Sequence, residues 1–166
     1  MPNLNWPCLG WALSMVVVAH VVEALSVGDA MKTRWPQLRQ PRFAAPVWLL
    51  AIAGVYYALL LLVLGYRLMV STARTEHVEA WSAAVGLLAV IMISNILWNA
   101  LLLKLNRFKL AVYQSMGYTA VITALVTVLL SFDATAAALA AVYGFWSVYA
   151  AFWTHGIWQA NTSSQA

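Results

Sequence analysis

Charged side chains are scarce in this sequence. They make up 8% of the 166 residues, whereas roughly 25% is typical of a soluble domain. Hydrophobic residues account for 64%, and the mean hydropathy is +0.80. This composition excludes an ordinary soluble domain and indicates an integral membrane protein.

Cysteine is almost absent as well, since Cys8 is the only one. A single cysteine excludes an intramolecular disulfide and a cluster of metal-binding thiolates. We expect Cys8 to be a small apolar packing residue. The sequence also lacks an evident internal repeat, and only its end, "QANTSSQA" after Trp158, is predicted to be flexible.

Five long apolar runs of about 20 residues each are present, at about 7–27, 44–66, 80–103, 110–131 and 135–158. Their apolar residues are continuous rather than alternating, which favours membrane-spanning helices over a β-barrel. The first run lacks the basic start of a signal peptide, so we expect it to be a helix of the bundle. The sequence therefore predicts an all-α membrane protein, a single five-helix transmembrane domain over 1–166 with a connection at about 28–43.

Basic residues are unevenly distributed between the two predicted membrane faces. One face holds seven of them: Lys32, Arg34, Arg39, Arg42, Lys104, Arg107 and Lys109. The opposite face holds only Arg67 and Arg74. The positive-inside rule then places the N-terminus outside and the C-terminus in the cytoplasm. This explains the net charge of +4 without a nucleic-acid partner, and we expect none. Asp29 and Asp133 are predicted to lie at helix ends.

The third apolar run contains two amides, which are costly in lipid. Asn95, Trp98 and Asn99 recur at i, i+3 and i+4, so they share one face of a helix. That face should point into the bundle. The amides then either hold helices together or form the polar floor of a ligand pocket, and both interpretations remain open.

The last run carries a stripe of aromatic residues at three- and four-residue spacing, namely Tyr143, Trp146, Tyr149 and Trp153. Such a stripe is compatible with ordinary core packing. The small residue Ala150 beside it also leaves space for a flat ligand. Both interpretations remain open from these residues alone.

His20 and Glu23 share a face of the first run, and ionisable residues within a membrane helix indicate a functional site. His155, in the last run, is expected in the same leaflet. The three residues are compatible with a metal, a metalloporphyrin or a proton-transfer site, although their spacing selects no metal. Alternatively, Glu23 extends toward Lys32 or Arg34 at the membrane surface and the histidines are structural.

Three blocks of the sequence resemble one family of membrane proteins. The connection follows the pattern W-Y-x-x-L-x-K-P-x-W-x-P-P-x-W at Trp35, Leu38, Pro41, Pro46 and Trp48. It departs from this pattern at Gln40, Phe43 and Ala45. The third run follows L-N-x-x-W-S-x-L-F-F-G at Asn95, Trp98 and Leu101. The last run follows P-Y-x-x-W-x-x-F-A-x-x-L-N-x-x-x-W-x-x-N at Tyr143, Trp146, Ala150, Trp158 and Asn161. The chain thus resembles the TspO/MBR family, the tryptophan-rich sensory and translocator proteins.

This resemblance implies five membrane helices, commonly dimeric, around a pocket that lies beneath the first connection. In the family, this pocket binds porphyrins such as protoporphyrin IX, haem and, in animals, cholesterol. The expected ligand-binding residues are Trp35, Arg39, Phe43, Trp48, Asn95, Trp98, Tyr143, Trp146 and Ala150. The cholesterol motif needs a late basic residue, and none follows Lys109, so sterol binding through that motif is not expected.

The leading hypothesis is therefore a receptor, not an enzyme, that binds a porphyrin or haem as a ligand and requires no cofactor. The alternatives are a membrane enzyme that uses His20 and Glu23 as an acid–base pair, and a porphyrin or lipid transporter. Repeated halves typical of alternating-access transporters are not evident. The expected partners are the lipid bilayer, a small hydrophobic ligand and a second copy of the chain in a homodimer. We expect a multi-pass protein of a bacterial membrane.

Overall fold

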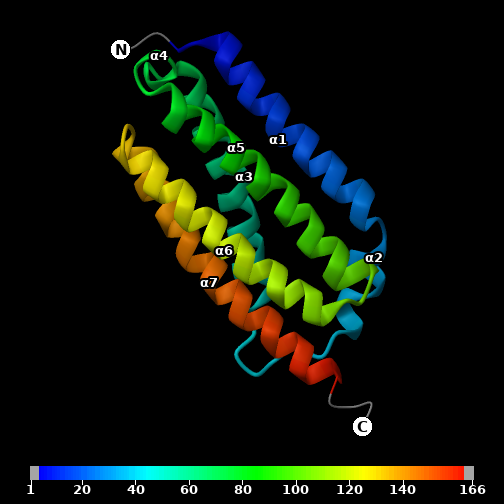
Figure 1. Cartoon of the computed structure of the whole chain (residues 1–166). Helices are drawn as coiled ribbons and strands as arrows, with labels where there is room; N and C mark the ends of the chain where they lie inside the picture. The colour runs from blue at the N-terminus through cyan, green and yellow to red at the C-terminus, as the bar shows by residue number, and fades with distance from the viewer. Residues whose placement is uncertain (1–3, 163–166) are drawn as a thin grey trace.

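The computed structural model describes residues 4–162 and shows five long helices (Figure 1). They are α1 (Trp6–Val27), α3 (Val47–Val70), α5 (Val78–Asn99), α6 (Phe108–Leu130) and α7 (Ala134–Thr162). Helix α5 continues into a π-helical turn, η2 (Ala100–Lys104). Three short elements lie in the connections: α2 (Ala30–Thr33), the 3₁₀ turn η1 (Trp35–Gln37) and α4 (Ala73–Glu76).

All five long helices are long and apolar enough to cross a membrane, and no strand occurs within residues 4–162. The predicted all-α, five-helix membrane fold is confirmed. Three helix boundaries differ from the predicted ones by three or four residues, and one of them is the end of α3, which lies at Val70 rather than near 66. Helix α3 begins at Val47 rather than near 44, since Pro46 is extended and disfavours helical backbone at Ala45. Helix α7 continues to Thr162, so the expectation of a flexible segment directly after Trp158 is wrong as far as Thr162. Residues 163–166 of that segment lie outside the described part.

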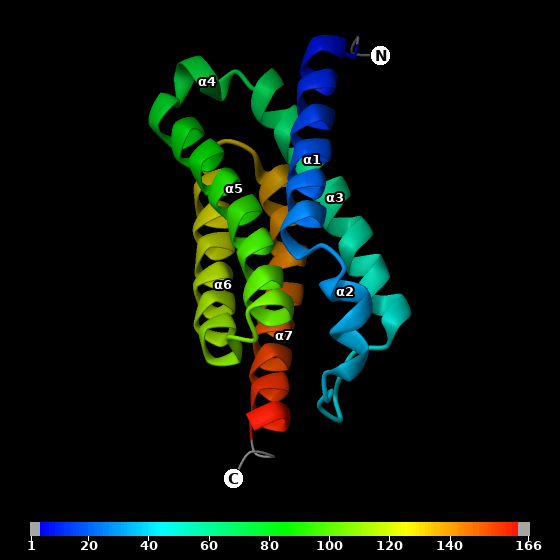
Figure 2. The ribbon, with the colours of Figure 1, turned by 90° about the vertical axis from the view of Figure 1, so that its right-hand side faces the viewer.

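Helix α7 packs along α6, and α6 packs along α5, while α1 lies against α3 and α5 (Figures 1 and 2). The segment from α2 to the start of α3 lies at the same end of the bundle as the C-terminal end of α7 (Figure 2). Gly144 of α7 lies against Ile122 of α6, and small residues of this kind let helices approach closely in lipid.

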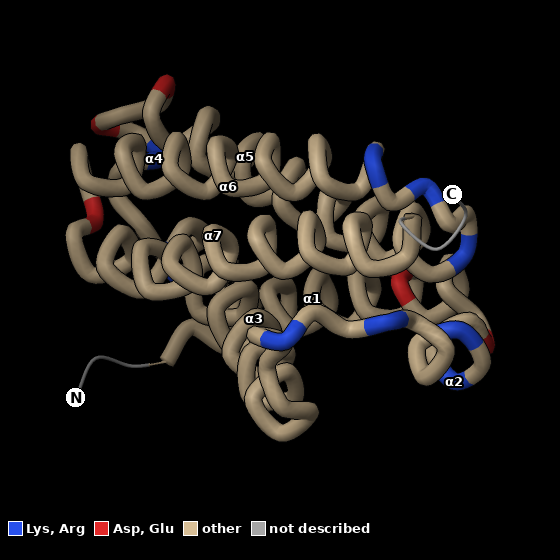
Figure 3. The backbone as a smooth tube through the Cα atoms, turned by 90° about the horizontal axis from the view of Figure 1, so that it is seen from below, with Lys and Arg blue, Asp and Glu red and all other residues tan. Residues whose placement is uncertain are grey.

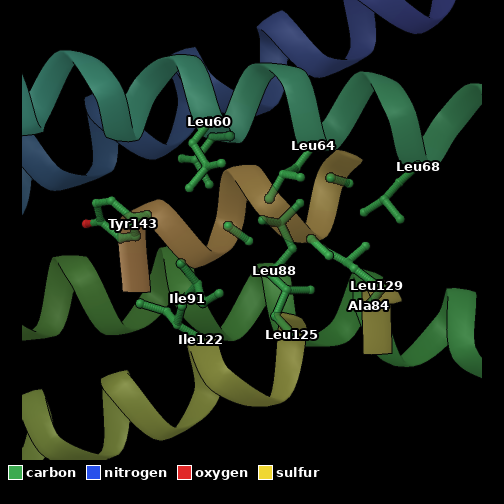
Figure 4. Packing of buried hydrophobic residues seen from close by; sticks show 14 of the residues in the cluster. Leu60, Leu64, Leu68, Ala84, Leu88, Ile91, Ile122, Leu125, Leu129 and Tyr143 are labelled. Atoms are coloured by element: carbon green, nitrogen blue, oxygen red, sulfur yellow. The ribbon is translucent and has the colours of Figure 1, made fainter. Parts of the chain in front are cut away.

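The main apolar core fills the half of the bundle away from α2. Leucines of α3, including Leu64, interdigitate there with Leu88 of α5 and with Leu125 and Leu129 of α6 (Figure 4). The core extends along α7 as far as Tyr143. Beyond Tyr143, toward α2, a second apolar cluster packs Leu101, Leu102 and Leu103 with Trp153 and Ile157. This half of the bundle also contains the cavity described below.

Charged residues divide between the two ends of the bundle. Figure 3 shows most Lys and Arg toward the end that carries α2, whereas Asp and Glu around α4 and the α6–α7 turn lie at the other end. At this second end, Arg67 forms an ion pair with Asp133, the only one among residues 4–162. Arg67 Nε donates to Asp133 Oδ2 (2.8 Å), and Nη2 donates to Oδ1 (2.7 Å).

Asp133 also caps helix α7, because its Oδ1 accepts the backbone N–H of Ala136 at 3.0 Å. Its predicted place at a helix end is confirmed. Its partner Arg67 comes from the last turn of α3, so the pair ties the end of one spanning helix to the start of another.

We expect Asp133→Asn to lower the stability by about 0.5–1 kcal/mol at pH 7. Asparagine keeps the cap but loses the charge, and Arg67 is 38% exposed, which screens the pair. The hydrogen-bonded guanidinium of Arg67 holds the pKa of Asp133 below its usual range. The contribution of the pair is therefore complete above a pH of about 4 and is lost as the pH falls through the lowered pKa.

Thermal unfolding in a neutral detergent at pH 7 and at about pH 3 measures this effect. The gap between wild type and Asp133→Asn should narrow at the lower pH. Glu79→Gln, which removes an exposed carboxylate at the same end, is the control and should match wild type at pH 7. Equal unfolding temperatures for wild type and Asp133→Asn at pH 7 would contradict a stabilising ion pair.

Candidate ligand-binding cavity

A cavity of about 980 Å³ lies between the helices in the half of the bundle that carries α2. This is the upper part of the size range of small-molecule sites in proteins. Its walls come from all five long helices, and Met31 and Trp35 line it at the α2 end. The cavity is therefore large enough for a flat polycyclic ligand.

Helix α7 supplies an aromatic wall, since Trp146 and Trp153 both line the cavity, and Tyr149 packs against both rings without lining it. Tyr149 stacks on Trp153, with ring planes 11° apart and centroids 6.4 Å apart, and the ring of Trp146 lies 5.2 Å from that of Tyr149. Trp153 also meets Trp35 edge-on at 5.4 Å and Trp98 at 6.0 Å. These contacts hold the rings in fixed orientations.

Trp98 is held by a hydrogen bond from its Nε1 to Thr154 Oγ1 at 3.0 Å. The Thr154 hydroxyl in turn donates to the carbonyl of Ala150 at 2.7 Å. Helices α5 and α7 are thereby joined directly behind the aromatic wall.

Helices α1 and α5 form a polar wall. Asn99 Nδ2 donates to Glu23 Oε1 at 2.6 Å, and Asn95 lies one turn before Asn99 on the same face of α5. His20 Nδ1 lies 2.8 Å from the carbonyl oxygen of Val16. Because a carbonyl only accepts, Nδ1 carries a proton and Nε2 remains for another partner. All four side chains line the cavity.

The segment between α2 and α3 is anchored to α7 by side chains. Asn161 Oδ1 accepts the backbone N–H of Arg39 (3.1 Å), and its Nδ2 donates to the Arg39 carbonyl (2.9 Å). The Tyr149 hydroxyl accepts the N–H of Ala45 (2.6 Å) and donates to the carbonyl of Phe43 (3.1 Å). Trp153 Nε1 donates to Gln40 Oε1 (3.0 Å).

Gly156 allows this close approach. A Cβ at this position would lie 2.8 Å from Pro41 and 2.9 Å from Phe43, closer than real Cβ contacts occur. The segment therefore rests directly on the backbone of α7 and covers the end of the aromatic wall.

The sequence profile of the TspO/MBR family matches residues 5–159. The chain belongs to the TspO/MBR family. The resemblance predicted from the three sequence blocks is thus confirmed over nearly the whole chain. No curated protein matches the chain. Membership of this family supports a membrane receptor or transporter that binds sterols or porphyrins in general.

Of the residues predicted as ligand-binding in this TspO/MBR protein, the structure brings six together around the cavity: Trp35, Asn95, Trp98, Tyr143, Trp146 and Ala150. His20 and Glu23 join them. Asn95 and Asn99 both line the cavity, and Asn99 in addition joins α5 to α1 through its bond to Glu23. Glu23 is hydrogen-bonded to Asn99. The alternative prediction, in which Glu23 extends toward Lys32 or Arg34 at the membrane surface, is therefore wrong.

Arg39, Phe43, Trp48 and His155 do not line the cavity. Arg39 is held at its backbone by Asn161, and Phe43 packs on Gly156. Trp48 is 64% exposed in the first turn of α3. The ring of His155 lies against that of Trp158 at 5.6 Å.

Small residues of α3 belong to the cavity but were not singled out from the sequence. Ala51, Gly54 and Ala58 recur at helical spacing and line it. The sequence signal for this part of the cavity was the helical spacing of these small residues, which indicates a helix face that does not fill the space beside it. Between residues 4 and 162, no three His, Cys, Asp or Glu side chains lie close enough together to hold a metal ion.

Proposed function

We propose that this TspO/MBR protein is a membrane receptor for a flat hydrophobic ligand of the porphyrin type, such as protoporphyrin IX or haem. The observation that carries the proposal is the cavity beneath an anchored connection, with Trp146 and Trp153 on one wall and polar side chains on another. A planar macrocycle gains dispersion and stacking energy against Trp146 and Trp153. The few polar groups opposite would orient it.

We also propose that the α2 end of the bundle faces the cytoplasm of a bacterial cell and that the protein works as a homodimer. The orientation is supported by the concentration of Lys and Arg at that end (Figure 3). The dimer is supported by the family resemblance. With this orientation the cavity opens in the cytoplasmic leaflet, beneath the connection that carries Arg39.

A titration of detergent-solubilised protein with protoporphyrin IX and with haem, followed by quenching of tryptophan fluorescence, tests the proposal. We expect saturable binding that weakens at least about tenfold in Trp146→Ala, as is usual when a central aromatic contact is removed. Trp11→Ala is the matched control, because Trp11 is 65% exposed on the outer face of α1. Wild type without saturable quenching, or equal losses in the two variants, would contradict a ligand site in this cavity.

A further inference from the structure

The cavity has an unbalanced set of charged groups. Its acidic and basic lining residues are Glu23 and His20, and no Lys or Arg of the described chain lines it. Arg39, expected from the sequence to face an anionic group of the ligand, lies in the connection outside the lining. A ligand inside the cavity therefore meets a carboxylate and no lysine or arginine.

The two ionisable groups are held so that they present acceptors. Glu23 is positioned by the amide donor of Asn99 on the neighbouring helix α5. His20 uses Nδ1–H for the carbonyl of Val16, so a neutral imidazole offers the lone pair of Nε2. A bound molecule that supplies a donor would pair with these acceptors, whereas a molecule that brings only acceptors would leave them without a hydrogen bond.

We propose that the polar wall selects a ligand whose buried polar group is a hydrogen-bond donor, either an ammonium or a hydroxyl group, and rejects a carboxylate there. This inference rests on the proposed function, because it assumes that the cavity binds a flat hydrophobic ligand. A carboxylate placed beside Glu23 would lose its hydration and face a like charge without a compensating cation. An ammonium group would gain a charge-assisted hydrogen bond. A tetrapyrrole with free carboxylates can bind only in an orientation that places these carboxylates outside the cavity, next to the connection between α2 and α3.

Three probes with one macrocycle test the selection: protoporphyrin IX with its two carboxylates, its neutral dimethyl ester, and a derivative whose two side chains end in tertiary amines. Each is titrated by tryptophan quenching into wild type, Glu23→Gln and Glu79→Gln. We expect wild type to bind the amine derivative on the order of 10- to 100-fold more tightly than the diacid. This ratio should fall at least about tenfold in Glu23→Gln.

Glu79→Gln is the matched control, since it removes an equal charge from an exposed site in the first turn of α5, at the far end of the bundle. It should keep the wild-type ratio. Binding of the ester shows whether the cavity of each variant is intact. A wild-type preference for the diacid, or the same ratio in wild type and Glu23→Gln, would overturn the selection while the receptor function stands. Failure of all three probes to bind wild type contradicts the proposed function and this inference with it.

Discussion

Trp153→Ala is expected to lower the stability of the protein by about 3–5 kcal/mol, as is usual for removal of a buried tryptophan. Trp153 is 3% exposed and lies where three parts of the structure meet. Its ring contacts Trp35 in the connection and Trp98 on α5, and its Nε1 is bonded to Gln40. The loss would combine an unfilled volume with an unpaired Gln40 side chain and a connection that is anchored less firmly.

Thermal unfolding in detergent measures the loss, and limited trypsin digestion at Arg39 and Arg42 measures the anchoring of the connection. Phe152→Ala is the control, because Phe152 is the neighbouring aromatic residue and is 65% exposed on the outer face of α7. It should leave both readouts close to wild type. Similar losses of stability in the two variants would mean that Trp153 has no special role at this junction.

The five spanning helices could be predicted from the sequence because lipid imposes a length and an apolar composition on each of them. Helical periodicity also placed Trp146 and Tyr143 on a common face of α7, and Asn95 with Asn99 on one face of α5. Both faces line the cavity. Within a regular helix, the direction of a side chain follows from its position in the turn.

The connection could not be predicted in the same way. Its course depends on contacts with Tyr149, Gly156 and Asn161, which are more than 100 residues further along the chain. These contacts turn Phe43 onto Gly156 and hold Arg39 at its backbone, so neither reaches the cavity. The family pattern identified Phe43 and the neighbouring Arg39 as candidate site residues, but it gave no information about where their side chains point.

Side-chain pairs that join two helices could not be predicted from a single sequence either. Asn99 with Glu23 and Arg67 with Asp133 are separated by 76 and 66 residues, and helix periodicity assigns each residue a face without a partner. The chemistry of the cavity depends on the first of these pairs, because it turns the Glu23 carboxylate into a positioned acceptor. Hence the fold followed from composition, whereas the kind of ligand depends on tertiary contacts.

Ala150→Phe is expected to weaken the binding of protoporphyrin IX on the order of 10- to 100-fold. Ala150 lines the cavity between Trp146 and Trp153, so a phenyl ring at this position would occupy space that a planar ligand needs. The same substitution should leave the unfolding temperature unchanged or raise it, because the ring fills a cavity rather than displacing packed atoms. Loss of binding without loss of stability distinguishes an occupied site from a damaged fold.

Val148→Phe provides the control on the same helix. Val148 is exposed on the outer face of α7, so its enlargement should alter neither the titration curve nor the unfolding temperature. If Ala150→Phe binds the porphyrin as tightly as Val148→Phe does, the ligand lies elsewhere on the protein and the aromatic wall is only a packing element. If Ala150→Phe loses both binding and stability, the space beside Ala150 is closed in the protein and cannot accept a macrocycle.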